Sequence, residues 1–311
     1  MTPDAPMRTR TRAPEPLYML AFDHRQVLRD LYPGATTDDL VRAKHTVLDA
    51  LGALTEDVPA RSLAFLVDEE YGGSAAQRAR RQGLYVAMPV EASRTPSLQF
   101  QYPDDYASRF ARDDPQSVKV LVFHNPDDDE DRQQAQFELL RRAGDLARDQ
   151  DRDYLLEVLV TPTAEQLREC GDDRSVFRTR LFPTLLVDSI AQMHQAGIEP
   201  DLWKVEGLAT VEDTAAVAAQ AMSGGRDHVR CIVLGSGESP ATVHQWLANA
   251  SAVPGFSGFA IGRTVWHRPL AGLLAGALTR EAAVEEMARS FAELVDAFGR
   301  EQTAVRAGRS G

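Results

Sequence analysis

Short hydrophobic runs recur along the chain, and each ends in glycine, charged or polar residues. Eight such segments occur, at 17–22, 62–73, 84–91, 118–131, 154–162, 201–208, 231–239 and 258–267. Most are separated by stretches with helical spacing of apolar residues, such as Leu40, Ala43, Val47 and Leu51. Continuous apolar strands that alternate with helices predict a parallel sheet covered by helices.

The helical spacing predicts helices over about 38–54, 74–82, 130–150, 176–197, 211–222, 240–250, 269–276 and 280–299. Thr37 is the N-cap that we expect for the first of them. The acidic run 127–129 is expected to be the solvated start of the helix over 130–150, because carboxylates suit a helix N-terminus. A metal site at these carboxylates is the weaker alternative.

Eight strand–helix units in about 285 residues favour an α/β fold of the (β/α)8 barrel type over an open sheet. No GxGxxG follows the first strand, and no P-loop motif occurs. The sequence therefore lacks the motifs that would best support a nucleotide-binding fold. We expect one barrel domain over 17–301. The polar ends at 1–16 and 302–311 are expected to be disordered tails.

Composition narrows the possible partners. The 311 residues carry a net charge of -12, which argues against nonspecific binding to nucleic acids and to anionic membranes. Cys170 and Cys231 lack disulfide-framework or zinc spacing, and no apolar run approaches the roughly 18 residues that span a bilayer. A cytoplasmic protein is therefore expected. The alanine- and leucine-rich helices over 269–299 could face the barrel or a second subunit, so a homo-oligomer is left open.

Lysine is rare, since only Lys44, Lys119 and Lys204 occur among 34 basic residues. Lys204 lies where a short apolar strand runs into a loop. A lysine in such a place loses hydration, its pKa falls, and its neutral amine can attack a carbonyl to form a Schiff base. The structural alternative is a lysine whose head reaches water or Glu206. Taken alone, Lys204 favours the structural alternative.

A barrel would bring five charged groups to one mouth, because its active site lies at the carboxyl ends of the strands. These groups are Asp23, Lys119, Glu157, Lys204 and Arg263. Lys119 and Glu157 lie inside apolar runs, where burying either unpaired would cost several kcal/mol. They must pair with each other or with a ligand. Such a pair is either purely structural or a proton shuttle beside Lys204.

The loops after the last two strands predict an anion site. Small residues at Gly235, Ser236 and Gly237 precede a helix N-terminus, whose N–H groups can face an anion. Gly262 and Arg263 add a guanidinium at the next strand end. Barrels frequently bind phosphate at this place, so the combination is more informative than either motif alone.

These segments together resemble a known family, the class I aldolases related to tagatose-1,6-bisphosphate aldolase. The nearest branch by resemblance occurs alone or fused behind 5-dehydro-2-deoxygluconokinase. The resemblance rests on LAFDHRQVLRDL (20–31), FLVDEEYG (65–72), VKVLVFHNPDD (118–128), LLEVLV (155–160), WKVEGL (203–208), VLGSGES (233–239) and GFAIGRTVWHRPL (258–270).

The resemblance implies a role for each matching position. Lys204 matches the Schiff-base lysine, and Asp23, Lys119 and Glu157 match the acidic, basic and acid/base positions. The implied phosphate and substrate site comprises Arg25, Gly235, Ser236, Gly237, Gly262 and Arg263. The chain departs from the family in MPVEAS (88–93) and in the acidic HNPDDDED (124–131), which favours a substrate with one phosphate.

The expected activity is retro-aldol cleavage of a phosphorylated ketose or keto acid, without metal or cofactor. By resemblance the substrate is 2-deoxy-5-keto-gluconate 6-phosphate, which gives dihydroxyacetone phosphate and malonate semialdehyde in inositol catabolism. Tagatose 1,6-bisphosphate and sulfofructose 1-phosphate are alternative substrates. A metal-dependent aldolase or epimerase using Asp68, Glu70 and His24, and a non-catalytic barrel that binds a sugar phosphate, are the rival functions.

Overall fold

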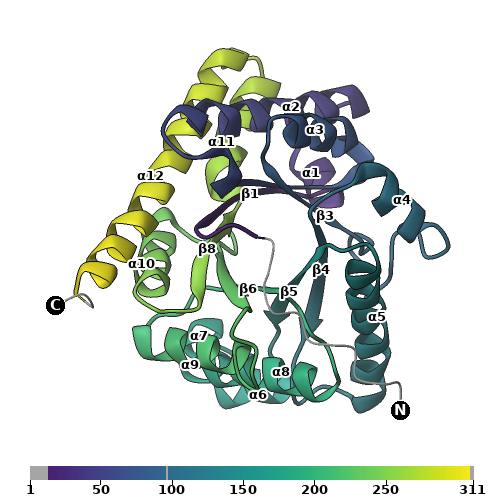
Figure 1. Cartoon of the computed structure of the whole chain (residues 1–311), viewed down its shortest axis with the longest axis vertical. Coiled ribbons are helices and arrows are strands. Elements are labelled where there is room, and N and C mark those ends of the chain that lie inside the picture. Colours follow the sequence, from purple (N-terminus) through teal and green to yellow (C-terminus); the bar gives the residue numbers. More distant parts are fainter. Residues whose placement is uncertain (1–12, 96, 309–311) are drawn as a thin grey trace.

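Eight parallel strands close into a barrel in the structure, a computed structural model that describes residues 13–95 and 97–308. Each strand pairs with its neighbours in chain order, and β8 closes the ring on β1. This confirms the predicted (β/α)8 barrel (Figure 1). The strands are β1 Leu17–Phe22, β2 Leu63–Val67, β3 Tyr85–Pro89, β4 Ser117–His124, β5 Asp153–Val160, β6 Leu202–Glu206, β7 Arg230–Leu234 and β8 Phe256–Ile261.

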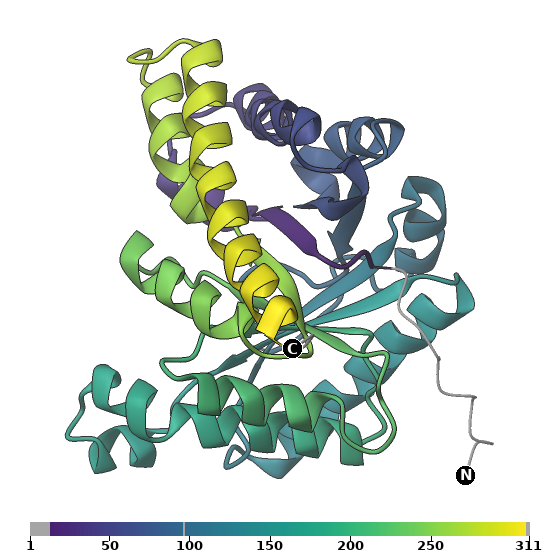
Figure 2. The same ribbon diagram turned by 60° about the vertical axis from the view of Figure 1, so that its left-hand side comes forward.

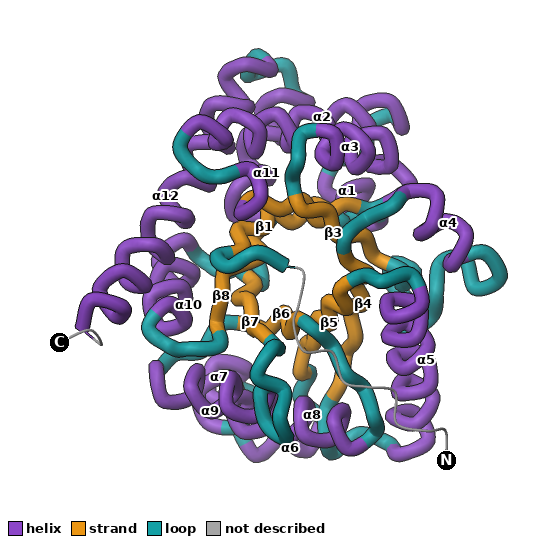
Figure 3. Tube along the Cα trace, viewed as in Figure 1, coloured by secondary structure: helices purple, strands orange, loops and turns teal. Residues whose placement is uncertain are grey.

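Helices surround the strands as an outer ring (Figure 3). The last one, α12, packs against α2, α10 and α11 and runs along the outside of the barrel (Figure 2). The helices are α1 Gln26–Leu31, α2 Thr37–Gly52, α3 Glu69–Arg81, α4 Tyr106–Asp113, α5 Glu130–Asp149, α6 Ala164–Glu169, α7 Arg174–Arg180, α8 Phe182–Gln195, α9 Val211–Ala221, α10 Pro240–Ser251, α11 Arg263–Leu274 and α12 Arg280–Gly308, with 3-10 turns at Ala53–Glu56 and Ala60–Ser62.

The hydrophobic core has two layers because side chains alternate along each strand. In β1, Leu17, Met19 and Ala21 belong to a small cluster inside the barrel. Tyr18 and Leu20 between them belong to the large cluster that faces the helices. The inner layer leaves the carboxyl ends of β4, β5 and β6 free for charged residues.

Two helices begin earlier than the sequence predicted. The N-cap of α2 is Thr36, one residue before the expected Thr37, because its hydroxyl accepts from the Asp39 N–H in a capping box. Helix α3 starts at Glu69, whereas helical spacing predicted a start near 74. The Asp68 carboxylate accepts from the Tyr71 N–H at 2.7 Å and so caps the earlier turn.

The last predicted strand was too long. β8 ends at Ile261, and residues 263–267, read as strand, form the first turns of α11. Gly262 marks the boundary, since a Cβ atom there would lie 2.2 Å from the carbonyl oxygen of Ala21. Val265 and Trp266 are buried as part of a helical stripe with Leu270.

Other differences concern short helices and the chain ends. Helices α1, α4 and α6 were missed, and the helix expected over 176–197 is the pair α7 and α8. Helix α12 continues to Gly308, past the expected domain end at 301. The expected N-terminal tail lies mostly in 1–12, which is outside the described residues. In the described part of the chain, no helix is both long enough and apolar enough to cross a membrane.

Candidate active site

A cavity of about 240 Å³ lies at the carboxyl ends of the barrel strands. It contains the four residues expected to carry the chemistry, Asp23, Lys119, Glu157 and Lys204, and a fifth, Glu91, that the sequence did not assign. These five form what we call the charged cluster. Three guanidinium groups also line the cavity, those of Arg25, Arg94 and Arg132.

Strand alternation turns three members of the charged cluster into the barrel. Lys119, Glu157 and Lys204 each stand between two neighbours that pack in the layer facing the helices. Those neighbours are Val118 and Val120, Leu156 and Val158, and Trp203 and Val205. Glu157 and Lys204 are also register partners across β5 and β6, so their side chains meet directly.

Lys119 is the centre of the cluster. Its Nζ atom lies 2.8 Å from Asp23 Oδ2, 2.7 Å from Glu91 Oε1 and 3.0 Å from Glu157 Oε2. Within residues 13–95 and 97–308, Lys204 has one carboxylate partner, since its Nζ lies 2.6 Å from Glu157 Oε1. Glu157 therefore joins both lysines, one through each oxygen. The expected pairing of Lys119 with Glu157 is present, and two further carboxylates extend it.

The electrostatics keep Lys119 charged. Burial alone would lower the pKa of Lys119, but Asp23, Glu157 and Glu91 outweigh it and raise that pKa well above its ordinary value. Burial would likewise raise the pKa values of Asp23 and Glu157. Lys119 nevertheless lowers the pKa of both carboxyls, with Lys204 adding to the effect at Glu157.

Glu91 behaves differently. Burial raises its pKa, and the charges of Lys119 and Arg25 offset only part of that shift. It lies two residues after β3, in the MPVEAS segment that looked like a departure from the family. A lone carboxylate at the end of a buried apolar run was the signal that could have identified it. The same signal had drawn attention to Asp23 after β1.

A β-hairpin forms one wall of the cavity. Residues 91 and 100 form an antiparallel bridge, and the Ala92 N–H donates to the Gln99 carbonyl at 2.8 Å. Arg25, only 5% exposed, fixes this hairpin by donating from Nη2 to the Glu91 carbonyl at 2.8 Å and from Nη1 to the Gln101 side chain. Arg25 thus lines the cavity, with two of its nitrogens bonded to the hairpin.

The expected anion loop and Arg263 do not line the cavity. Their link to it is His24, a lining residue whose pKa is lowered by burial and, to a smaller extent, by the nearby charge of Arg263. Ser236 and Gly237 both have left-handed φ angles, 49° and 80°, and Arg263 Nη2 donates to the Ser236 carbonyl at 3.1 Å. The Ser236 hydroxyl donates to Glu206 at 2.6 Å, and Arg178 donates to the same Glu206 oxygen at 2.9 Å. The structure therefore brings Ser236, Gly237 and Arg263 together, whereas Arg25 lies apart from them at the hairpin. Gly235 begins the turn, as its carbonyl accepts from the Glu238 N–H.

The acidic run after β4 does not line the cavity. Asp129 caps α5, and Asp127 accepts from Gln166 at 2.9 Å. Asp128 pairs with Arg132 at 3.0 Å, and from this connection it is Arg132 that reaches the cavity. The acidic sequence therefore gives no reason to exclude a second phosphate, and that part of the substrate expectation loses its basis.

The third lysine is structural. Lys44 is fully buried, pairs with Asp68 at 2.5 Å and donates to the His24 carbonyl at 2.9 Å.

The carboxylates of the alternative metal site have other positions or partners. Asp68 pairs with Lys44 and caps α3, while Glu70 is exposed on α3. Among the described residues, no three His, Cys, Asp or Glu side chains are grouped as metal ligands, so these two carboxylates and His24 do not form the alternative metal site.

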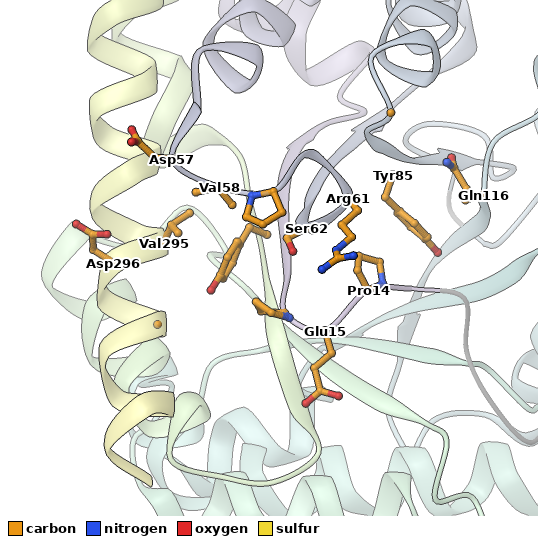
Figure 4. A pocket seen from close by; sticks show the side chains of 15 residues that line it. Pro14, Glu15, Asp57, Val58, Arg61, Ser62, Tyr85, Gln116, Val295 and Asp296 are labelled. Atoms are coloured by element: carbon orange, nitrogen blue, oxygen red, sulfur yellow. The ribbon is translucent and has the colours of Figure 1, made fainter. Parts of the chain in front are cut away.

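A larger cavity, of about 1110 Å³, lies at the opposite end of the barrel (Figure 4). Pro14, Arg61, Tyr85 and Asp296 are among its lining residues. It holds none of the charged cluster. Because barrel chemistry is built at the carboxyl ends of strands, we assign the candidate active site to the smaller cavity.

Comparisons with known proteins identify the family of this chain. A family model described as "Uncharacterized protein conserved in bacteria (DUF2090)" matches residues 6–302. The chain belongs to this family. A tagatose 1,6-diphosphate aldolase 1 from Streptococcus mutans serotype c is 27% identical to the DUF2090 chain over 192 residues, which are 60% of this chain and 57% of the relative. The match thus spans little more than half of that relative.

A solved structure shares the barrel. Cgl0159 from Corynebacterium glutamicum superposes with a TM-score of 0.56 at 17% identity, over 89% of this DUF2090 chain and 85% of that one. At this identity the likeness shows the fold alone. The similarity to the streptococcal aldolase agrees with the resemblance of the sequence motifs to an aldolase-related family.

Proposed function

We propose that this DUF2090 protein is a class I aldolase that cleaves a phosphorylated ketose or keto acid through a Schiff base on Lys204. The observation that carries the proposal is the contrast between the two lysines of the charged cluster. Lys119 pairs with three carboxyl groups, whereas Lys204 pairs, among the described residues, with Glu157 alone and lines the cavity. Lys119 supplies a fixed positive charge, and Lys204 is the amine with a base beside it.

Schiff-base formation needs a proton acceptor and a proton donor close to the amine. Glu157 accepts a proton from Lys204 across 2.6 Å, which leaves the amine lone pair free to attack the substrate ketone. The carbinolamine that forms loses its hydroxyl as water and becomes an iminium. The positive charge of Lys119, 3.0 Å from the other Glu157 oxygen, holds that carboxylate in place throughout.

Carbon–carbon cleavage then uses the iminium as the electron sink. The Asp23 carboxylate removes the proton from the hydroxyl at the breaking bond, because Glu157 still holds the proton that it took from Lys204. The bonding electrons move to the iminium to give an enamine. The aldehyde product leaves. Protonation of the enamine and hydrolysis of the resulting iminium release the ketone product and restore Lys204.

Phosphate binding belongs to the loops after β7 and β8. Arg263 and the backbone amides around Ser236 and Gly237 provide a guanidinium and N–H donors for one phosphate. The binding energy of this remote group positions the carbonyl over Lys204. By the resemblance of its motifs, the substrate is 2-deoxy-5-keto-gluconate 6-phosphate. The similarity to the streptococcal protein also supports testing tagatose 1,6-bisphosphate.

The test is turnover of a panel of ketose and keto-acid phosphates, with release of triose phosphate as the readout. We expect cleavage that a metal chelator does not reduce, and its loss in Lys204→Met. Lys44→Arg, which keeps the buried cation away from the cavity, is the matched control and should turn over normally if it folds. Activity that disappears with the chelator, or persists in Lys204→Met, contradicts the proposal.

A further inference from the structure

Glu91 is the member of the charged cluster to which neither the sequence nor the proposed function assigns a role. It is 6% exposed, lines the cavity, and contacts Lys119 through Oε1 at 2.7 Å. Its other oxygen, Oε2, is buried and has no hydrogen-bond partner among the described residues. A buried, unsatisfied carboxyl oxygen costs free energy unless a ligand completes it.

The charges of the cluster favour a proton on one carboxyl group. Three carboxyl groups contact the ammonium group of Lys119, and Lys204 pairs with one of them. Arg25 adds a nearby positive charge, but its nitrogens bond to the Glu91 carbonyl and to the Gln101 side chain. Ionising all three buried carboxyl groups at once therefore costs free energy, which a proton on one of them removes. The remaining question is which of the three carries it.

The contacts single out Glu91. Glu157 has both lysines as partners, and Asp23 lies beside Lys119 and the neighbouring His24. Among the described residues the Glu91 carboxyl pairs with Lys119 alone, and Arg25 bonds to the backbone carbonyl of Glu91 rather than to its carboxyl. The charged and titratable groups that face Glu91 come from the segment after β1, from β4 and from β5: Asp23, Arg25, Lys119, Tyr154 and Glu157.

The direction of its pKa agrees with this assignment. Burial raises the pKa of Glu91, whereas Lys119 lowers the pKa of Asp23 and of Glu157. A proton on Oε2 would also explain why that oxygen has no donor pointing at it. As an acid it needs an acceptor, and a substrate oxygen in the cavity is the acceptor available.

We propose that Glu91 is a catalytic acid that enters the reaction protonated and serves Schiff-base formation at Lys204. This inference rests on the proposed function. Glu91 gives its proton to the hydroxyl of the carbinolamine. The carbon–oxygen bond breaks, water leaves, the nitrogen lone pair forms the iminium, and Glu91 becomes a carboxylate held by Lys119.

The cycle closes when the product iminium is hydrolysed. The Glu91 carboxylate removes a proton from the attacking water as the oxygen bonds to the iminium carbon. Glu91 is then protonated again, and protons and electrons balance over one turnover. Because the acid form starts the cycle, the rate of Schiff-base formation should fall on the alkaline side as Glu91 ionises.

The experiment compares wild type with Glu91→Gln, which keeps the shape and removes the proton. The rate of borohydride-trappable adduct formation should fall about 100-fold or more, within the range for loss of an acid catalyst. Long incubation should still label Lys204, since the amine is intact. The alkaline limb of the rate profile should disappear, and Glu91→Asp should restore part of the rate. An adduct that forms in Glu91→Gln within about threefold of the wild-type rate overturns the proposal.

A second readout needs no turnover. The infrared spectrum of the wild type at pH 7 should contain a protonated carboxyl band that Glu91→Gln lacks. Glu69→Gln is the matched control, because Glu69 pairs with Arg109 and Arg112 outside the cavity, and both band and rate should remain. If no adduct forms even in wild type, the aldolase function fails together with the catalytic step. In that case the infrared band still tests whether Glu91 is protonated. If the band is absent from the wild type, the protonated state of Glu91 is refuted as well.

Discussion

Replacing Lys119 with Met removes the ammonium group that contacts the carboxyl groups of Asp23, Glu91 and Glu157, while nearly preserving the side-chain length. Taking one partner out of a buried ion pair costs about 3–5 kcal/mol, because it leaves uncompensated charge in the interior. With an unfolding entropy of about 2.1 cal/mol/K per residue, 311 residues give roughly 0.65 kcal/mol/K. The melting temperature at pH 7 should therefore fall by about 5–8 °C.

The pH dependence identifies the cause of that loss. In wild type, Asp23 and Glu157 have lowered pKa values, so their stabilising contribution is present above their unfolded pKa values of about 4 and is lost on acidification. Without Lys119, burial should raise these pKa values instead. In the Lys119→Met variant, the ionised carboxylates then destabilise the fold at neutral pH. This destabilisation decreases as the carboxylates take up protons at lower pH. The stability difference between the two proteins should shrink from pH 7 to pH 4.

Urea or thermal unfolding across this pH range is the assay. Lys44→Met is the matched comparison, because it leaves one carboxylate, that of Asp68, without its ion-pair partner. The loss of stability in this variant should depend less on pH. The pKa of Lys119 is raised, so the stability that Lys119 contributes to the wild type should be fully present below about pH 10 and should be lost only at higher pH. A stability difference that is independent of pH between 7 and 4 refutes the electrostatic account of the cluster.

Three further variants probe separate parts of the site. Arg263→Met should raise KM for phosphorylated substrates about 10-fold or more and leave unphosphorylated analogues little changed, and an equal effect on both would contradict a phosphate role. Gly262→Ala should lower the melting temperature or prevent folding, because the added Cβ would lie 2.2 Å from the Ala21 carbonyl oxygen; wild-type stability would show that this contact relaxes. Arg25→Met should speed amide exchange across the hairpin that begins at Glu91, and unchanged exchange would show that Arg25 does not fix it.

The barrel was predictable because its signal repeats. Eight apolar strands that each end in polar residues leave few alternatives, and alternation then fixes which side chains face inward. Lys119, Glu157 and Lys204 were found in this way, since charged residues inside apolar strands must meet each other. The meeting of Glu157 with both lysines follows from strand register, which the sequence pattern only implies.

Features set by contacts between distant segments were not predictable. Glu91 joins the cluster because the connection after β3 folds into a hairpin, which Arg25 from the segment after β1 holds in place. The end of β8 was misplaced because Thr264, Val265 and Trp266 are residue types that favour strands. The close approach of Ala21 to Gly262, which marks the true end, cannot be read from the sequence. The early start of α3 depends on a single cap, Asp68.

The most direct test of the central claim is the identity of the lysine that meets the substrate carbonyl. Protein incubated with a turned-over ketose phosphate and reduced with borohydride should gain the mass of the triose phosphate on the peptide that contains Lys204, and on no other lysine. Lys204→Met should gain no mass under the same conditions. Label on Lys119 or Lys44, or no label at all during active turnover, would contradict the account.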